Sequence, residues 1–216
     1  MTSKLLKVSA FAAFAALATP NAFAAKEKAN TAKKPTPAAA EVKTEFDPAA
    51  SVIKWEGKKV TGTHHGKIQL KSGFITMKGK DLTGGEFVID MTTIADEDLT
   101  DPEYNRKLVT HLSSEDFFNA AKYPTSVLKI KSVKSVHGFT GPTFEVKADL
   151  TIKDKTNEVK FPAEIKTKDG KTTATANITI DRTKWGIKYG SGKFFTGLGD
   201  KVINDEFKLD IALSTK

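Results

Sequence analysis

Histidines and acids are the residues of this chain best suited to holding a metal ion. His64 and His65 are adjacent, and neighbouring side chains of a strand point to opposite faces, so the two cannot readily chelate one ion. Four acids also lie close together, at Asp96, Glu97, Asp98 and Asp101. They lack the glycine and the terminal glutamate of a calcium-binding hand. We interpret them as a solvated loop and predict no metal site.

Glycine-rich segments and serines offer no catalytic motif. Gly190-Ser191-Gly192-Lys193 and Gly197-Leu198-Gly199 lack the spacing and the parallel-sheet context of a phosphate-binding loop, so we interpret both as turns. No serine occupies a nucleophile-elbow pattern, and the chain has no cysteine for thiolate chemistry or disulfides. The sequence therefore predicts no catalytic residue and a protein that is not an enzyme.

Arginine is rare here, since Arg106 and Arg182 are the only two among 34 basic residues. The planar guanidinium suits bidentate contact with a carboxylate or a phosphate. Arg182 is followed closely by Lys184 and Trp185, so one interpretation places it beside the polar head of a ligand. The other interpretation is a structural salt bridge to a nearby aspartate, and for Arg106 we favour that structural role.

The elements that must position these residues are mostly strands. Apolar and polar residues alternate with a period of two, which is typical of antiparallel strands that bury one face. The expected strands are 53–60, 67–71, 74–78, 86–91, 125–136, 144–152, 159–166, 173–180 and 203–213. Glycine-rich turns are expected at 71–73 and 83–85, and a bulge is expected near Val127 and Leu128.

Two helical pieces interrupt the strands. One is expected at 102–112, and a second begins with Ser114 as its N-cap. Many short strands with local turns predict a mainly β fold, an antiparallel barrel with a short helical excursion, for which a sandwich is the alternative. Small inward residues would leave a cavity in such a barrel, unless the abundant phenylalanines fill it. These small residues are Ala148, Ala163, Ala174 and Ala176.

The N-terminal residues are expected to lie outside this domain. Residues 1–24 have a basic start, an apolar run and the small-residue pattern Ala22-Phe23-Ala24, which together predict a signal peptide and an exported, periplasmic or secreted protein. Residues 25–45 are rich in Ala, Lys and Pro and are expected to be a disordered linker. Residues 46–216 are expected to form one domain. The net charge is +8 for the whole chain and about +4 for that domain, which has no basic run that would indicate nucleic-acid binding.

Four sequence blocks invite comparison with known families. They are Asp116-Phe117-Phe118 with Tyr123-Pro124, Leu150-Thr151-Ile152 with Thr156 and Val159, Ile180-Asp181-Arg182 with Trp185-Gly186-Ile187, and Val202-Ile203-Asn204-Asp205-Glu206-Phe207. In this order, the blocks resemble the YceI-like family of polyisoprenoid-binding proteins. The resemblance implies a lipocalin-like antiparallel barrel, periplasmic or secreted, that holds an isoprenoid chain.

On this hypothesis, inward positions of the strands form the wall of an apolar tunnel. The candidate tunnel residues are Trp55, Ile68, Phe87, Ile89, Leu128, Ile130, Phe144, Val146, Phe161, Ile178 and Phe207. The candidate residues for the mouth and the head group are Phe117, Phe118, Arg182, Lys184 and Trp185. All depend on strand parity, because a one-residue slip of register would turn them outward.

The predicted function is carriage or sequestration of a long isoprenoid lipid, such as a polyprenyl phosphate or a quinone, bound as a ligand and not as a cofactor. One alternative is a non-catalytic stress or interaction protein with a filled core. Another is an enzyme that acts on an isoprenoid-type substrate, which a carboxylate with a perturbed pKa inside the cavity would indicate. Transient membrane contact and a homodimer formed through an exposed edge strand are further candidate interactions.

Overall fold

The alternating segments form nine antiparallel strands in the computed structural model, which describes residues 40–138 and 141–216. Four strands precede the helix: β1 (Glu41–Glu45), β2 (Val52–Lys59), β3 (Gly62–Lys78) and β4 (Asp81–Asp96). The helix is α1 (Pro102–Ser113). Five strands follow it: β5 (Thr125–Gly138), β6 (Gly141–Ile152), β7 (Lys155–Lys168), β8 (Lys171–Asp181) and β9 (Ile203–Ser214). Short 3₁₀ turns are η1 (Pro48–Ala50), η2 (Arg182–Trp185) and η3 (Gly199–Lys201).

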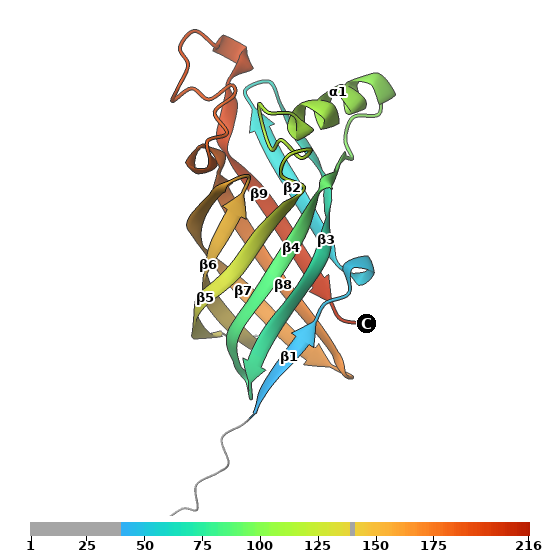
Figure 1. Ribbon diagram of the computed structural model, residues 1–216, viewed down its shortest axis with the longest axis vertical. Helices are drawn as coiled ribbons and strands as arrows, with labels where there is room; N and C mark the ends of the chain where they lie inside the picture. The colour runs from blue at the N-terminus through green and yellow to red at the C-terminus, as the bar shows by residue number, and fades with distance from the viewer. Residues whose placement is uncertain (1–39, 139–140) are drawn as a thin grey trace, which may run out of the picture. The chain divides into compact units, whose positions relative to one another are not determined.

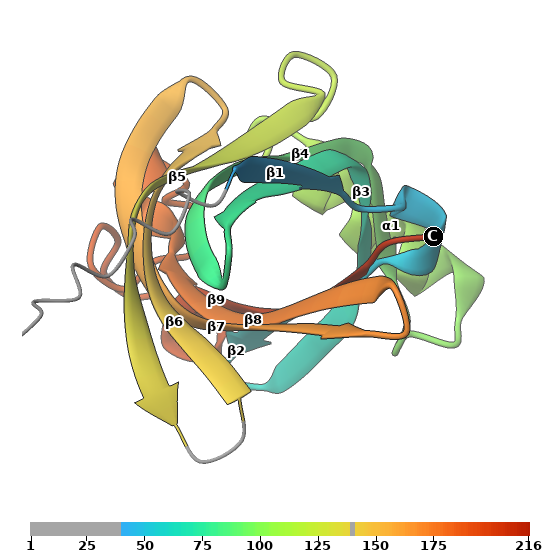
Figure 2. The ribbon, with the colours of Figure 1, turned by 90° about the horizontal axis from the view of Figure 1, so that it is seen from below.

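Eight of these strands close into a barrel (Figures 1 and 2). Neighbours follow the order β3-β2-β9-β8-β7-β6-β5-β4, and pairing between β3 and β4 completes the ring. Each of these strands therefore has a neighbour on both sides, so closure satisfies hydrogen-bonding groups that an open sheet would leave at its edges. The expected mainly β barrel is confirmed, and the sandwich alternative is wrong.

β1 lies inside the segment that was expected to be a disordered linker. Residues 41–45 pair antiparallel with residues 74–78 of β3, and Phe46, which follows, is 5% exposed. The alternation in β1 is weak, and even its apolar residue Val42 is exposed, so backbone pairing with β3 holds this strand in place. A sequence pattern carries little information about such pairing. Residues 1–39 lie outside the described residues, so the signal peptide and the rest of the linker stay predictions.

The turns expected at 71–73 and 83–85 are wrong. β3 continues through 71–73 with a local shift of register, and the chain reverses at Gly79 and Lys80. Gly85 instead lies inside β4, where an added Cβ would come within 2.7 Å of a β3 carbonyl oxygen. Glycine there permits the two strands to approach closely, which is the other common reason for glycine in a strand.

The bulge in β5 lies slightly later than expected. Val127 and Leu128 pair regularly with β6, and the register shifts between Ile130 and Ser132. Leu128 and Ile130 therefore keep the inward parity that the sequence pattern assigns to them. Beyond the shift, Val133 takes the position opposite Val146 of β6. An extra residue of this kind bends the strand and increases its twist.

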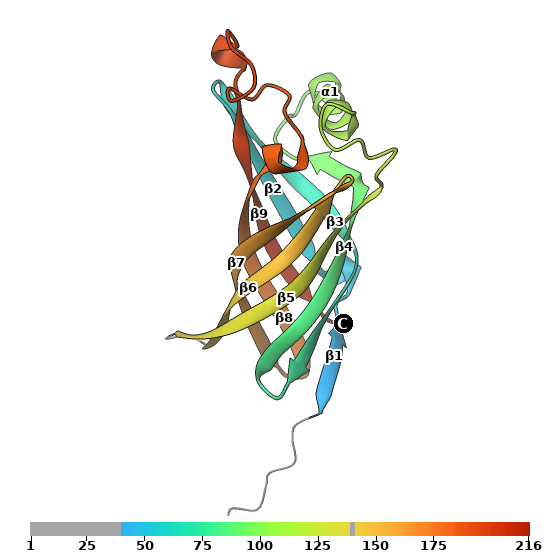
Figure 3. The ribbon, with the colours of Figure 1, turned by 60° about the vertical axis from the view of Figure 1, so that its left-hand side comes forward.

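The helix α1 ends where a second helix was expected to begin. Its N-cap is Asp101, whose carboxylate accepts hydrogen bonds from two N–H groups of the first turn, at 2.8 and 3.2 Å. Ser114 is the C-cap of α1, and its N–H donates to the carbonyl oxygen of His111, after which the chain continues in turns. α1 and the segment between β8 and β9 lie at the same end of the barrel (Figure 3). Among the described residues, no helix has the length and hydropathy needed to cross a membrane.

Candidate ligand cavity

The barrel encloses a cavity of about 530 Å³. Small-molecule sites typically measure about 300–1,000 Å³. All eight barrel strands contribute side chains to its wall, together with residues of α1 and of the loops at the same end. Figure 2 shows how the strands surround this interior. The space is therefore not filled by side chains, contrary to the alternative in which phenylalanines pack it completely.

Small residues on two neighbouring strands help to keep the interior open. Ala163 of β7 lies opposite Ala176 of β8, and Ala174 lies two residues before Ala176 on the same strand. All three line the cavity. Methyl groups at these positions leave space that larger residues would occupy. Ala148 was grouped with them, but it is fully buried and does not lie at the wall.

The candidate tunnel residues all point into the barrel, as their strand parity predicts. Every one except Phe144 lines the cavity: Trp55, Ile68, Phe87, Ile89, Leu128, Ile130, Val146, Phe161, Ile178 and Phe207. Phe144 is 1% exposed and belongs to the hydrophobic core, so its ring is enclosed by packed atoms and has no free surface toward the cavity. Parity identifies which side chains face inward, but not which of them keep open space beside them. Contact of these residues with a ligand stays a prediction.

Aromatic side chains gather at the α1 end of the cavity. Phe117 and Phe118, predicted for the mouth, both line it, and Phe118 meets Phe207 of β9 with ring centroids 6.1 Å apart. His111 packs edge-on against Phe117 at 4.9 Å and against Tyr189 at 4.6 Å. No strand pattern could have predicted His111 or Tyr189 here, because one lies on a helix and the other on an irregular segment.

Arg182 lines the same end, but protein groups already engage its guanidinium. Its three nitrogens donate to backbone carbonyl oxygens of Ile187, Asn204 and Ile203 at 3.0–3.1 Å, and Asp205 is 3.7 Å away. The side chain is 4% exposed. Burial lowers the pKa of Arg182, and the nearby carboxylate of Asp205 opposes that shift. The geometry thus matches the structural alternative, in which Arg182 joins the segment after β8 to the start of β9.

Two further residues predicted for the mouth lie elsewhere. Lys184 is exposed and does not line the cavity. Trp185 is 2% exposed and does not line it either, because its indole packs in the core and donates from Nε1 to the carbonyl oxygen of Leu150 at 3.0 Å. The 3₁₀ turn η2 departs from the strand alternation on which both predictions relied. The predicted placement of both residues at the mouth is therefore wrong.

Charge is concentrated at one end of the cavity. Among the described residues, the lysines and acids that line it are Lys58 and Lys59 at the end of β2, Asp200 and Lys201 in η3, and Glu206 in β9. All lie at the α1 end, whereas the rest of the wall is almost wholly apolar. The cavity therefore has an apolar body and a polar mouth, which suits an amphipathic guest with a long apolar tail.

Comparisons with known proteins agree with this architecture. The YceI-like domain model matches residues 45–215. The fold is similar to that of Burkholderia cenocepacia BcnA, with a TM-score of 0.61, 20% identity, and coverage of 79% of this chain and 99% of that one. It is also similar to a polyisoprenoid binding domain from Saccharophagus degradans implicated in plant cell wall breakdown, with a TM-score of 0.55, 11% identity, and coverage of 79% and 95%. A search of curated protein sequences found no significant match.

The closed antiparallel barrel with one short helix is the fold of a YceI-like domain. Because the family model covers most of the chain, the protein belongs to the YceI-like family. The resemblance inferred from the four sequence blocks is confirmed.

Proposed function

We propose that the barrel binds the tail of a long isoprenoid-type lipid, such as a polyprenyl phosphate or a quinone, and carries or sequesters it outside the cytoplasm. The observation that carries the proposal is an apolar cavity of about 530 Å³ with charged residues at one end. Membership of the YceI-like family and the likeness to a polyisoprenoid binding domain support the choice of ligand. The leader pattern in residues 1–24 supports the location.

Burial of the tail supplies the binding energy in this proposal. Each buried CH₂ contributes about 0.8 kcal/mol, so about twenty buried carbons contribute about 16 kcal/mol. Association costs about 4–15 kcal/mol, which explains why a long chain is favoured over a short one. The lysines Lys58, Lys59 and Lys201 lie where a phosphate head would emerge. They replace Lys184 as candidates for head-group contact.

Binding, rather than catalysis, is the activity that these residues support. A carboxylate with a raised pKa inside the cavity would have indicated an enzyme. Asp200 and Glu206 line the cavity at its mouth, and both are exposed to solvent. Among the described residues, Asp96 is the carboxyl group whose pKa lies above its ordinary value, chiefly through burial, and it is not part of the cavity wall.

Native mass spectrometry tests the proposal directly. Protein purified from its own host in mild detergent-free buffer is expected to carry one lipid per chain, and organic extraction should release an isoprenoid. Repeated spectra of bare protein would contradict the proposal.

Tryptophan fluorescence gives a second test with a defined probe, a quinone that bears an isoprenoid tail. Trp55 lines the cavity, whereas Trp185 lies behind the wall. The quinone should quench emission in the wild type, and Trp55→Phe should remove most of that quenching. Equal quenching in both proteins would place the quinone outside the barrel.

We also propose transient membrane contact at the mouth, where a lipid would enter. Phe194 and Phe195 are 46% and 49% exposed there, and Lys188 Nζ lies 4.5 Å from the ring centre of Phe194. Exposed aromatics beside lysines suit the interface of an anionic bilayer. Replacement of both phenylalanines by serine should reduce co-sedimentation with anionic vesicles, and unchanged co-sedimentation would contradict this contact.

A homodimer stays a prediction. β1 offers an edge strand for it, since in the described chain β1 pairs with β3 alone.

A further inference from the structure

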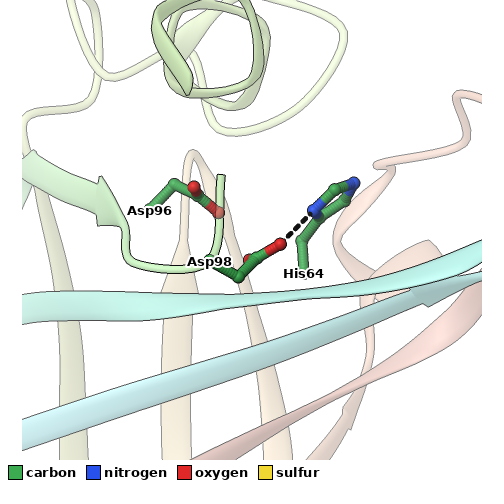
Figure 4. A group of neighbouring side chains, drawn as sticks. All are labelled: His64, Asp96 and Asp98. Atoms are coloured by element: carbon green, nitrogen blue, oxygen red, sulfur yellow. Dashed lines mark hydrogen bonds and ion pairs between the residues drawn. The ribbon is translucent and has the colours of Figure 1, made fainter. Parts of the chain in front are cut away.

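A histidine and two aspartates from separate parts of the sequence meet beside the barrel mouth. One ring nitrogen of His64 and one oxygen each of Asp96 and Asp98 lie within 4.8 Å of one another. Figure 4 shows the three side chains, with His64 Nδ1 2.9 Å from Asp98 Oδ2. His64 is in β3, Asp96 ends β4, and Asp98 follows two residues later. The two weak metal signals of the sequence are thus parts of one cluster.

A close approach of two strands brings the cluster together. Gly66 lies opposite Asp96 in the pairing of β3 with β4. A Cβ at Gly66 would lie 1.9 Å from the carbonyl oxygen of Ala95, so only glycine fits there without displacement of the β4 backbone. The N–H of Glu97 then donates to the carbonyl oxygen of His65 at 2.9 Å. This contact keeps the chain after β4 against the start of β3.

The remaining contacts hold both carboxylates in fixed orientations. Asp96 Oδ1 accepts from the N–H of Leu99 at 2.9 Å and from Nδ2 of Asn105 at 3.0 Å. Asp98 Oδ1 accepts from the N–H of His65 at 2.7 Å. His65 also stays close to the cluster, since its Nδ1 lies 3.8 Å from Asp98 Oδ1, although its side chain is 58% exposed. The three candidate ligands are therefore oriented before any ion binds, which favours binding.

One oxygen of this cluster has no hydrogen-bond partner within the part of the chain that the structure describes. Asp96 is 9% exposed, and its Oδ2 is buried without a donor. A buried carboxylate oxygen left in this state costs free energy, which a proton or a cation would recover. Burial raises the pKa of Asp96, and the nearby Asp98 raises it further. Burial also acts on Asp98, but hydrogen bonds from His65 and His64 outweigh it and lower the pKa of that carboxyl group.

We propose that His64, Asp96 and Asp98 form a binding site for one divalent transition-metal ion, with Zn²⁺ as the best-matched probe. One imidazole nitrogen and two carboxylate oxygens are ligands that Zn²⁺ uses, and three protein ligands leave a fourth position for water or another ligand. Ca²⁺ and Mg²⁺ prefer sites made of oxygen ligands alone. The site is separate from the lipid tail, although His64 also lines the cavity.

Zinc binding by the metal-free, full-length protein tests the proposal without any lipid. Titration calorimetry after chelator treatment is expected to show one Zn²⁺ per chain, which excess Mg²⁺ does not displace. Asp96→Asn and His64→Gln should each weaken binding by at least about tenfold. Asp96→Asn keeps the size of the side chain, and circular dichroism verifies that it folds.

Two matched substitutions serve as controls. Glu97→Gln removes a neighbouring carboxylate that pairs with Lys67, and His111→Gln removes the other histidine that lines the cavity, which pairs with Asp116 at 3.1 Å. Both should bind Zn²⁺ like the wild type. Co²⁺ added to the wild type should give the absorption of a four-coordinate nitrogen and oxygen site, and this absorption should disappear in His64→Gln.

Three results would overturn the proposal. Absence of zinc binding in the wild type would show that the cluster holds a proton only. Equal affinity in the wild type, Asp96→Asn and His64→Gln would place the ion elsewhere, and loss in His111→Gln alone would place it at that histidine. Because the assay contains no lipid, a negative result here does not contradict the proposed lipid function. A negative result in the lipid assays likewise does not contradict the zinc site.

Discussion

Replacement of Ala176 by phenylalanine should abolish most lipid binding while the barrel stays folded. Ala176 lies on β8 with its methyl group at the cavity wall, opposite Ala163 of β7. A phenyl ring at this position would project into space that the proposed tail occupies. The backbone pairing of β8 with β7 and β9 does not depend on this side chain. The substitution therefore separates the cavity from the fold.

The size of the effect follows from the carbon atoms that the ring displaces. If it excludes about four CH₂ groups of the tail, binding loses about 3 kcal/mol, at about 0.8 kcal/mol each. This corresponds to about a hundredfold weaker affinity. The melting temperature should not fall, because the ring occupies open space, whereas insertion into packed atoms typically costs about 1–3 kcal/mol.

The measurement is the fluorescence titration of Trp55 with the tailed quinone. The matched control is Asn177→Phe, since Asn177 is the next residue of β8 and is exposed on the outer face. This variant adds the same ring to the surface and should bind the quinone normally. A folded Ala176→Phe with wild-type affinity would refute the view that the ligand lies against β8. A marked fall of its melting temperature would show that the space beside Ala176 is not open.

Three further predictions concern stability. Arg182→Met should lower the free energy of unfolding by several kcal/mol, because three buried or part-buried carbonyl oxygens lose their donor at about 1–3 kcal/mol each. In urea unfolding, the exposed control Arg106→Met should change it by less than about 0.5 kcal/mol. Gly66→Ala should destabilise the barrel by about 1–3 kcal/mol or more. The control is Gly62→Ala, where an added Cβ meets no described atom within 4 Å. Equal urea unfolding midpoints for the two variants would contradict the close approach of β3 and β4. The Asp181 carboxylate accepts hydrogen bonds from the N–H and Oγ1 of Thr183 and pairs with Lys193. Burial raises the pKa of Asp181, but these contacts outweigh burial and hold that pKa below its ordinary value of 3.8. Its contribution to stability is therefore complete above pH 3.8 and lost as the pH falls through the folded-state pKa, so the melting temperatures of the wild type and Asp181→Asn should differ at pH 6 and converge at the acid end.

The local pattern of the sequence determined the strands and the direction of their side chains. Alternation in β6 to β9 is regular because each strand buries one face, so the inward parity of Val146, Phe161, Ile178 and Phe207 could be predicted. The family resemblance was also available, since its residue blocks are contiguous in the chain. Both kinds of information depend on residues that are close in sequence.

Only the tertiary structure decided features that depend on pairing between distant segments. β1 has little alternation of its own and forms because β3 is available to pair with it. The packing of Phe144 and Trp185 depends on neighbours from other strands. His64 and Asp96 are more than thirty residues apart, and the approach of β3 to β4 at Gly66 brings them together. The physical reason is the same in each case. A residue's type and spacing set which face it presents, whereas open space, burial and ligand geometry depend on which other chain segment lies opposite.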